Sequence, residues 1–347
     1  MMGEKNRRRK IPHKFIFEEC WLSNEECEKT VEEAWKGKQG LIQGRIACCG
    51  KELDKWGNRL FGDIQKKIRK LQSKLQHLNT IKQEEGVILQ IKEAEADLDE
   101  ALKEEEIWWA QRSQTNWLRH GDQNSRFFHQ KASKRKSRNW VKAIKNDARV
   151  THEEEEKIEV VMVEYFDNIF RSEGMEEARQ AADVVKNRVD TEKREFLNQP
   201  FTVEEVTQAL KQMHPTKAQG LDGVPALFYQ KMWRIVGYDI TNYVLNILNH
   251  EADPSPINST HIYMIPKIKN PRYAKDFRPI SLFNVVFKLV TKTITNRLKQ
   301  IFSGIVGEFQ STFVQDRLIT DNGFVAFKIF HYMKKKVTGQ KGTLDSN

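Results

Sequence analysis

The stretch LDKWGNRLFGDIQKKIRKLQSKLQHL, residues 53–78, sets the structural class of this chain. Its large apolar side chains recur every three or four residues, which is the repeat of one face of an α-helix. These side chains are Leu53, Trp56, Leu60, Ile64, Ile68, Leu71, Leu75 and Leu78. Gly86 interrupts the pattern, and a second stripe follows that consists of Ile88, Ile91, Leu98, Leu102 and Trp109. We therefore predict an antiparallel helical hairpin with coiled-coil-like packing over residues 46–113.

Two capping-box patterns predict further helix starts. In such a box, a Ser or Thr side chain and a Glu three residues later satisfy the free N–H groups of a first turn. Residues 23–26, SNEE, should begin a short helix that ends near Gly37, and residues 202–205, TVEE, should begin another. The strongly acidic stretch 93–106 is predicted to be a solvated helix face.

Short segments rich in β-branched and aromatic residues predict a minor β content. Residues 260–268, THIYMIPKI, and 276–282, DFRPISL, should be two extended segments ahead of a helix at 284–302. A further hairpin or an extended segment is expected at 141–151, followed by a helix at 153–170. The predicted fold class is mainly α with small β elements (α+β).

The charge balance predicts a polyanionic partner. The chain has 58 Lys and Arg residues against 48 Asp and Glu residues, a formal net charge of +10.

No run of about eighteen apolar residues is present, and the basic N-terminus lacks an apolar core. We expect a protein that neither spans a membrane nor is secreted, located in the nucleus or the cytoplasm. Residues 7–10 are either a nuclear localisation patch or a frayed basic tail.

The four cysteines show no zinc-site spacing. Cys20, Cys27, Cys48 and Cys49 lack the paired Cys-x-x-Cys or His pattern of such a site. We predict reduced thiols and no metal site.

Residues 119–149 are the strongest candidate for nucleic-acid binding. They contain ten Lys or Arg residues and two aspartates, with aromatic side chains between them. Basic side chains neutralise phosphates, and exposed aromatic rings stack on unpaired bases, so the predicted partner is RNA or single-stranded DNA. The candidate residues are Lys134, Arg135, Lys136, Arg138 and Lys142. A solvated helix face is the alternative for them, and Phe127 and Phe128 are predicted to be core residues.

A tight turn is predicted at Gly220, Asp222 and Gly223. We expect Asp222 to cap the helix that follows, because Asp is a preferred N-cap residue. A metal-holding role is the alternative, although no second acidic residue lies nearby in the sequence.

Several stretches resemble the polyprotein of a LINE-type (non-LTR) retrotransposon, which contains a reverse transcriptase. Residues 117–129, WLRHGDQNSRFFH, are similar to a box in the connector before the polymerase. Residues 310–322, QSTFVQDRLITDN, are similar to a motif before the palm, and 217–223, KAQGLDG, resemble part of the fingers together with 265–282. Residues 15–22, FIFEECWL, look like the end of an endonuclease domain. The chain departs from the family at Gln219 and Leu221, where prolines are usual, and at Asp316, where glycine is usual.

The resemblance implies four segments. They are an endonuclease remnant at 1–22, a helical connector at 23–113, a basic connector and linker at 114–194, and a partial reverse transcriptase domain at 195–347. The last segment would hold the fingers and the start of the palm.

The resemblance also implies roles for single residues. In related reverse transcriptases a lysine and an arginine of the fingers hold the triphosphate of the incoming nucleotide, and these positions match Lys267 and Arg278. An ion pair with Asp276 and contact with a template backbone are the alternatives for Arg278. The intact family uses Mg²⁺ held by palm aspartates, for which this chain offers at most Asp345. We therefore expect a reverse transcriptase fragment with no catalytic residue, no bound metal and no polymerase activity alone. A nucleic-acid-binding remnant and a non-functional coiled-coil relic are the alternatives.

Overall fold

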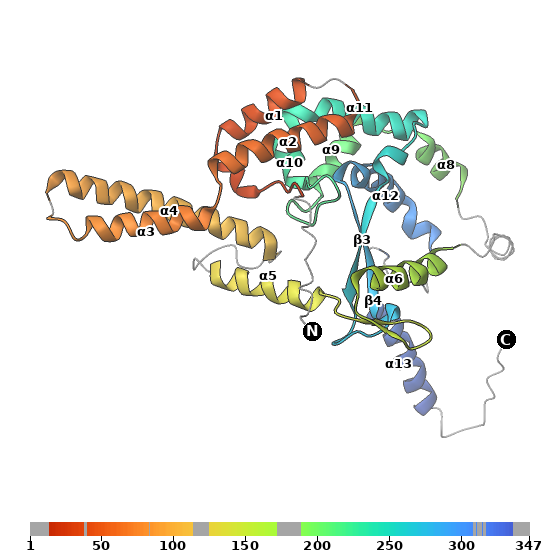
Figure 1. The fold of residues 1–347 in the computed structure, drawn as a ribbon. Helices are drawn as coiled ribbons and strands as arrows, with labels where there is room; N and C mark the ends of the chain where they lie inside the picture. Colours follow the sequence, from red (N-terminus) through yellow and green to blue (C-terminus); the bar gives the residue numbers. More distant parts are fainter. Residues whose placement is uncertain are drawn as a thin grey trace. The chain divides into compact units, whose positions relative to one another are not determined.

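The computed structural model describes residues 14–37, 40–82, 84–113, 125–171, 189–307, 310, 314 and 317–335. The chain divides into two compact units, one formed by Met1–Glu173 and Phe201–Val290 and the other by Gly174–Pro200 and Thr291–Asn347. The described residues are mostly helical and contain two short antiparallel strand pairs (Figure 1). The prediction of a mainly α chain with small β elements is thus confirmed. The assignment to fingers and palm stays a prediction.

The core of the first unit combines helices that lie far apart in the sequence. They are α1 (Glu26–Lys36), α2 (Ile42–Leu60), α9 (Val203–Lys211), α10 (Ala226–Lys231), α11 (Trp233–His250) and the first turns of α12 (Val285–Ile305). Phe17 joins this core from the N-terminal segment, and its ring centroid lies 5.3 Å from that of Phe228. The Phe17 N–H donates to the Gly223 carbonyl at 3.0 Å. The four-segment division stays a prediction, but its first, second and fourth segments share this one core.

The helical hairpin is shorter than predicted. It consists of α3 (Ile64–Leu78) and α4 (Glu85–Ser113), which lie side by side (Figure 1). Leu53 and Trp56 belong instead to α2 and to the core of the first unit. The predicted bounds of 46–113 are therefore wrong at the N-terminal end, where the hairpin begins at Ile64.

A turn between α2 and α3 explains the difference. Gly62 has a φ of +41°, a backbone conformation that favours glycine. Asp63 then begins α3, because its carboxylate accepts a hydrogen bond from the Lys66 N–H at 3.1 Å. The turn occupies only the residues between Leu60 and Ile64. The apolar side chains therefore keep their interval of four residues although one helix ends and another begins there.

The face of α4 that packs on α3 includes small side chains. Ala94 and Ala101 are fully buried, whereas Ile88, predicted in the stripe, is 40% exposed. Gly86 lies in the first turn of α4, and the two helices are connected by residues 79–84. The side chains at a contact set the distance between two helix axes, so alanines permit a close approach.

Five of the eight acidic residues in the stretch 93–106 are exposed, as predicted, and Glu105 and Glu106 are partly exposed. Glu104 is the exception, with 8% of its surface exposed. It accepts a hydrogen bond from Lys67 Nζ of α3 at 3.3 Å. The prediction of a solvated residue is wrong here, because α3 supplies a cation across the helical pair.

One capping box is confirmed and the other is wrong. The Thr202 hydroxyl accepts from the Glu205 N–H, and the Glu205 carboxylate accepts from the Thr202 N–H at 2.9 Å. The Ser23 hydroxyl instead donates to the Cys20 carbonyl at 2.7 Å, within the 3-10 helix Glu19–Ser23. Helix α1 therefore begins later, at Glu26, although it does end beside Gly37 as predicted.

The predicted β segments form two antiparallel pairs. Strand β3 (Thr260–Pro266) pairs with β4 (Phe277–Phe283), and β1 (Ile144–Lys145) pairs with β2 (Thr151–His152). Helix α6 (Glu155–Phe170) follows β2, and its predicted position is confirmed. A small second core joins these elements through Ile144, Met162, Phe166, Ala274 and Phe277.

The second unit contains α8 (Thr191–Asn198), the later turns of α12 and α13 (Ile319–Lys335). Arg297 of α12 is 4% exposed. Its guanidinium donates to the carbonyls of Leu197 at 3.4 Å, of Pro200 at 3.0 Å and of Gln199. Carbonyls at the end of a helix lack intrahelical partners, so Arg297 satisfies the end of α8.

None of the described helices is long and apolar enough to cross a membrane.

Candidate nucleic-acid interface

The basic helix α5 (Ser125–Asn139) presents its cations to solvent. The five predicted nucleic-acid-binding residues are all exposed, four on α5 and one just after it: Lys134, Arg135, Lys136, Arg138 and Lys142. The aromatic side of α5 faces the protein. Phe128 is 2% exposed, as predicted for a core residue, and the His129 ring contacts that of Trp109 on α4 with centroids 4.4 Å apart. Helix α5 therefore packs on α4 with its basic residues outward.

The basic segment 119–149 meets a second basic segment in the first unit, residues 267–278, which lies more than a hundred residues further along the chain. The Lys145 N–H of β1 donates to the Arg272 carbonyl at 2.7 Å, and Lys145 forms a parallel bridge with Tyr273. Arg272 lies in the loop between β3 and β4, which also carries Lys269 and Lys275. The loop and β1 thus form one basic surface, which sequence reasoning missed because no local pattern reports this contact.

The predicted nucleotide-binding residues Lys267 and Arg278 lie on one face of the β3–β4 pair. Arg278 is opposite Ile265, and Lys267 follows two residues after Ile265, so alternation along the strands places both cations on the same face. The Lys267 N–H extends the ladder by donating to the Asp276 carbonyl at 2.8 Å. Both side chains are exposed, and Lys267 Nζ donates to the Lys275 carbonyl at 2.7 Å. The opposite face contributes Phe277 to the second core.

The alternative of an ion pair between Arg278 and Asp276 is not supported. The Asp276 carboxylate accepts hydrogen bonds from the N–H groups of Arg272 at 2.9 Å and Tyr273 at 3.0 Å. These N–H groups lower the pKa of Asp276 below its usual value. The carboxylate therefore shapes the β3–β4 loop, and the described structure records no bond between it and Arg278.

The turn at Gly220, Asp222 and Gly223 is confirmed, but the predicted helix cap is wrong. Asp222 Oδ1 accepts from the Val224 N–H at 3.0 Å, whereas α10 begins after Pro225 without a side-chain cap. Gly223 has a φ of +70°, and a Cβ there would collide with the Phe15 carbonyl. A Cβ on Gly220 would collide with the Asn284 side chain. Both glycines are therefore required by close backbone approach rather than by chemistry.

Asp222 and Lys288 are two charged groups held inside the first unit. Burial raises the pKa of Asp222 to about 6, although Lys288 and the Val224 N–H act in the opposite direction. Burial also lowers the pKa of Lys288, whose Nζ donates to the Ala218 carbonyl at 3.1 Å. Lys288 and Arg297 are both cations of α12, but their contacts to backbone carbonyls make them structural.

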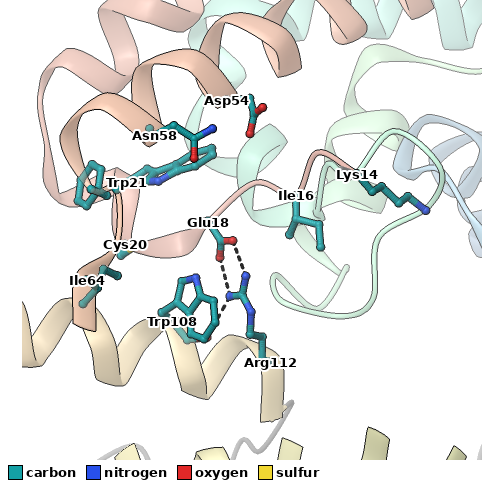
Figure 2. A pocket seen from close by; sticks show the side chains of 13 residues that line it. Lys14, Ile16, Glu18, Cys20, Trp21, Asp54, Asn58, Ile64, Trp108 and Arg112 are labelled. Atoms are coloured by element: carbon teal, nitrogen blue, oxygen red, sulfur yellow. Dashed lines mark hydrogen bonds and ion pairs between the residues drawn. The ribbon is translucent and has the colours of Figure 1, made fainter. Parts of the chain in front are cut away.

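The end of α4 is fastened to the N-terminal segment. Arg112 binds Glu18 through two hydrogen bonds of 2.6 and 2.8 Å, and its guanidinium lies 3.4 Å from the Trp108 ring centroid. Figure 2 shows these side chains at the edge of a cavity of about 160 Å³. The Gln111 side chain adds bonds to the Phe17 carbonyl at 2.7 Å and to the Glu19 N–H at 2.9 Å. This clamp fixes the C-terminal end of α4, against which α5 packs.

Some predicted features fall outside the described residues. These are the basic patch at 7–10, residues 117–124 of the connector box, Asp316 and Asp345. Within the described ranges, no three His, Cys, Asp or Glu side chains are grouped so that they could hold a metal ion.

No model of a known protein family matches the chain. The chain is 28% identical over 229 residues to the "Transposon TX1 uncharacterized 149 kDa protein" of Xenopus laevis. The match covers 65% of this chain and 17% of that protein, so the chain spans less than a fifth of its relative's length. The comparison therefore shows that about two thirds of the chain is similar to a transposon protein.

Proposed function

We propose that this chain is the nucleic-acid-binding part of a LINE-type reverse transcriptase polyprotein, where it holds single-stranded RNA or DNA. The similarity to a transposon protein and the motifs at 117–129, 217–223 and 310–322 support this origin. The intact family copies RNA into DNA, and we propose a nuclear or cytoplasmic site of action.

The observation that carries the proposal is the meeting of the two basic segments at Lys145 and Arg272. Cations spread along a chain can be a solvated surface, but this tertiary hydrogen bond brings cations of both segments close together, which supports a role in binding a phosphate backbone. Exposed Lys267 and Arg278 extend this basic surface along one face of the β3–β4 pair.

Within this surface, we propose different roles for the two strand residues and for α5. Lys267 and Arg278 would hold the phosphates of an incoming nucleotide, since a guanidinium binds phosphate oxygens bidentately and an ammonium supplies a mobile charge. The basic residues of α5 would contact the backbone of a strand. Mg²⁺ serves the intact family, but the described residues include no cluster that fits a metal ion, so no step is assigned to one.

A salt titration tests the proposal. The affinity of the wild-type chain for single-stranded RNA should fall steeply with salt, with a slope of about 0.7 per phosphate contacted. Replacing Lys134, Arg135, Lys136 and Arg138 together with Ala should flatten that slope by about two to three units. The matched control replaces Lys29, Lys36, Lys51 and Lys55 on α1 and α2 with Ala, which removes the same charge and should leave the slope unchanged.

The outcomes separate the alternatives. Equal slopes for the wild type and the α5 variant would remove α5 from the binding surface. A similar loss of slope in both quadruple variants would mean that only net charge matters. Absence of any RNA binding at moderate salt would contradict the proposal and favour a non-functional or protein-interaction role.

A further inference from the structure

A second cavity, of about 510 Å³, lies in the first unit between β1, α6 and the loop that leads into β4. Its size falls within the range of about 300–1,000 Å³ that is typical of small-molecule sites. Three cations and two tyrosines line it: Lys145, Arg149, Lys275, Tyr165 and Tyr273. We call it the tyrosine cavity. It contains neither the predicted residues of α5 nor Lys267 and Arg278.

The turn and the loop that line this cavity are anchored to packed elements. Ile144 is 1% exposed and lies in the second core with Met162 and Phe166 of α6, which holds β1 against that helix. Ala274 belongs to the same core and lines the cavity. The β-bridge between Lys145 and Tyr273 connects the loop that leads into β4, which forms the rest of the cavity wall, to β1. The backbone segments that carry the cations and rings are therefore held next to one another.

The turn between β1 and β2 holds Arg149 in an uncommon backbone conformation. Its φ is +62°, which is rare for a residue with a long side chain. Asn146 maintains the turn, because its carbonyl accepts from the Arg149 N–H and its Oδ1 accepts from the Val150 N–H, both at 2.9 Å. Backbone strain of this kind is concentrated at functional sites. Here its effect is to place Arg149 in the cavity wall.

The chemistry of the lining fits a nucleotide better than a bare anion. Lys275 Nζ lies 5.3 Å from the Tyr273 ring centroid, so a positive charge and an aromatic face occur together. Aromatic faces stack on unpaired bases, and cations bind phosphates. Asp147 and Glu164 also line the cavity. Carboxylates accept hydrogen bonds from the amino group of cytosine, but they repel free phosphate.

We propose that the tyrosine cavity receives one unstacked nucleotide of a single-stranded nucleic acid. Its base would lie against Tyr165 or Tyr273, and its phosphates would contact Lys145, Arg149 and Lys275. This inference rests on the proposed function, since the strand would reach the cavity over the basic surface joined at Lys145 and Arg272.

Removing one ring tests the proposal in the full chain. The probe is a ribo-oligonucleotide of ten cytidines. Tyr273→Leu should weaken its binding about 5- to 150-fold, the fold-change expected for loss of one base stack. The salt slope should stay the same, because no phosphate contact is removed. Tyr273→Phe keeps the ring and should bind like the wild type. Circular dichroism of each variant verifies that the fold is intact.

Charge variants test the phosphate side of the same cavity. Arg149→Gln combined with Lys275→Gln should flatten the salt slope by about 1.4 units, from about 0.7 for each lost contact. The control combines Lys29→Gln with Lys51→Gln on α1 and α2, which changes net charge equally and should leave the slope unchanged.

Free cytidine 5′-monophosphate and inorganic phosphate distinguish the possible ligands. If the oligonucleotide binds with a steep salt slope but no cavity variant alters its binding, the cavity proposal is overturned and the proposed function stands. If only the mononucleotide binds and Tyr273→Leu abolishes its binding, the cavity is a nucleotide site and the strand-binding function is wrong. If inorganic phosphate competes as well as the mononucleotide, the site recognises an anion, which overturns the assignment of a base. If nothing binds, both proposals fail.

Discussion

Arg297 in α12 and Arg138 in α5 both lie in helices that contain Lys and Arg but no Asp or Glu, yet the structure uses them in opposite ways. Arg297 is 4% exposed and donates to three backbone carbonyls near the end of α8. Arg138 is exposed on the outer side of α5. The difference shows that the count of cations in a segment does not identify a binding surface. What decides is whether the helix face that carries the charge is buried, so the interior charges should govern stability and the surface charges should govern binding.

The largest expected effect comes from Arg297→Met. The variant leaves the carbonyls near the end of α8 without their donor, and unsatisfied buried acceptors cost about 2–4 kcal/mol of unfolding free energy. Lys299→Met, an exposed position two residues later in the same helix, is the matched control and should leave the stability unchanged. Urea denaturation of both variants measures the difference. Equal midpoints would show that the interior position of Arg297 carries no special cost.

The interior carboxylate Asp222 gives the next effect, of the opposite sign. Its pKa of about 6 in the folded protein exceeds its usual value of 3.8. Its contribution to stability is therefore present below about pH 4 and is lost as the pH rises through 6. Asp222→Asn keeps the acceptor for the Val224 N–H and removes the buried charge. We expect it to stabilise the protein at pH 8 by about 1–2 kcal/mol, less than the full shift implies because part of the side chain remains in contact with solvent.

The pH dependence provides the check on Asp222. The difference in unfolding free energy between the two proteins should be largest at pH 8 and should vanish near pH 4. Asp97→Asn, at an exposed site of α4, should show no such trend. A constant difference between pH 4 and 8 would mean that the Asp222 carboxylate is not destabilised by burial.

A charge pair of intermediate burial should give an intermediate effect. The side chains of Arg112 and Glu18 are 28% and 12% exposed, and they share two hydrogen bonds. Arg112→Met should cost about 1–3 kcal/mol and should raise amide hydrogen exchange in the last turns of α4. Lys36→Met breaks an exposed pair with Glu32 on α1 and should change neither quantity. If both variants behaved alike, the Glu18–Arg112 clamp would be no more than a surface contact.

Local signals in the sequence were sufficient for several elements. Thr202 and Glu205 form the predicted capping box, and the alternation at 260–268 and 276–282 gave two strands that differ from β3 and β4 by at most two residues at their ends. Such signals succeed because capping and strand alternation depend on residues a few positions apart. The nucleic-acid-binding candidates on α5 are exposed, which is compatible with both predicted alternatives, a binding surface and a solvated helix face, so their role stays a prediction.

Two kinds of feature were missed: one turn within the apolar repeat, and several contacts between segments that lie far apart in the sequence. The turn at Gly62 and Asp63 was hidden because it fits within one interval of the apolar repeat, although Gly-Asp before a helix was a usable signal. Arg297 lies at helical spacing from Thr293 and Ile301, which are also buried, but its partners lie outside α12 and could not be identified from the sequence. The contact between Lys145 and Arg272 likewise depends on tertiary packing.

The smallest expected effect concerns Arg278, an exposed cation that we assign to a nucleotide rather than to a strand. In the RNA titration, Arg278→Ala should change the salt slope by much less than the about 0.7 units of one phosphate contact. Lys142 is an exposed cation of the predicted strand-binding set, so Lys142→Ala should lower the salt slope by about 0.7 units. This variant shows how large the loss of one phosphate contact is, and the effect of Arg278→Ala is compared with it. Neither change should alter the midpoint of urea unfolding, because both side chains are on the surface.

A loss of a full phosphate contact in Arg278→Ala would move this residue from the nucleotide to the template, which was its second alternative. The result would also extend the strand path along the face of β3 and β4, since Lys267 lies on the same face as Arg278. The two assignments thus differ in one measurable slope, and they differ because a guanidinium that holds a separate nucleotide releases no counterion when the strand binds.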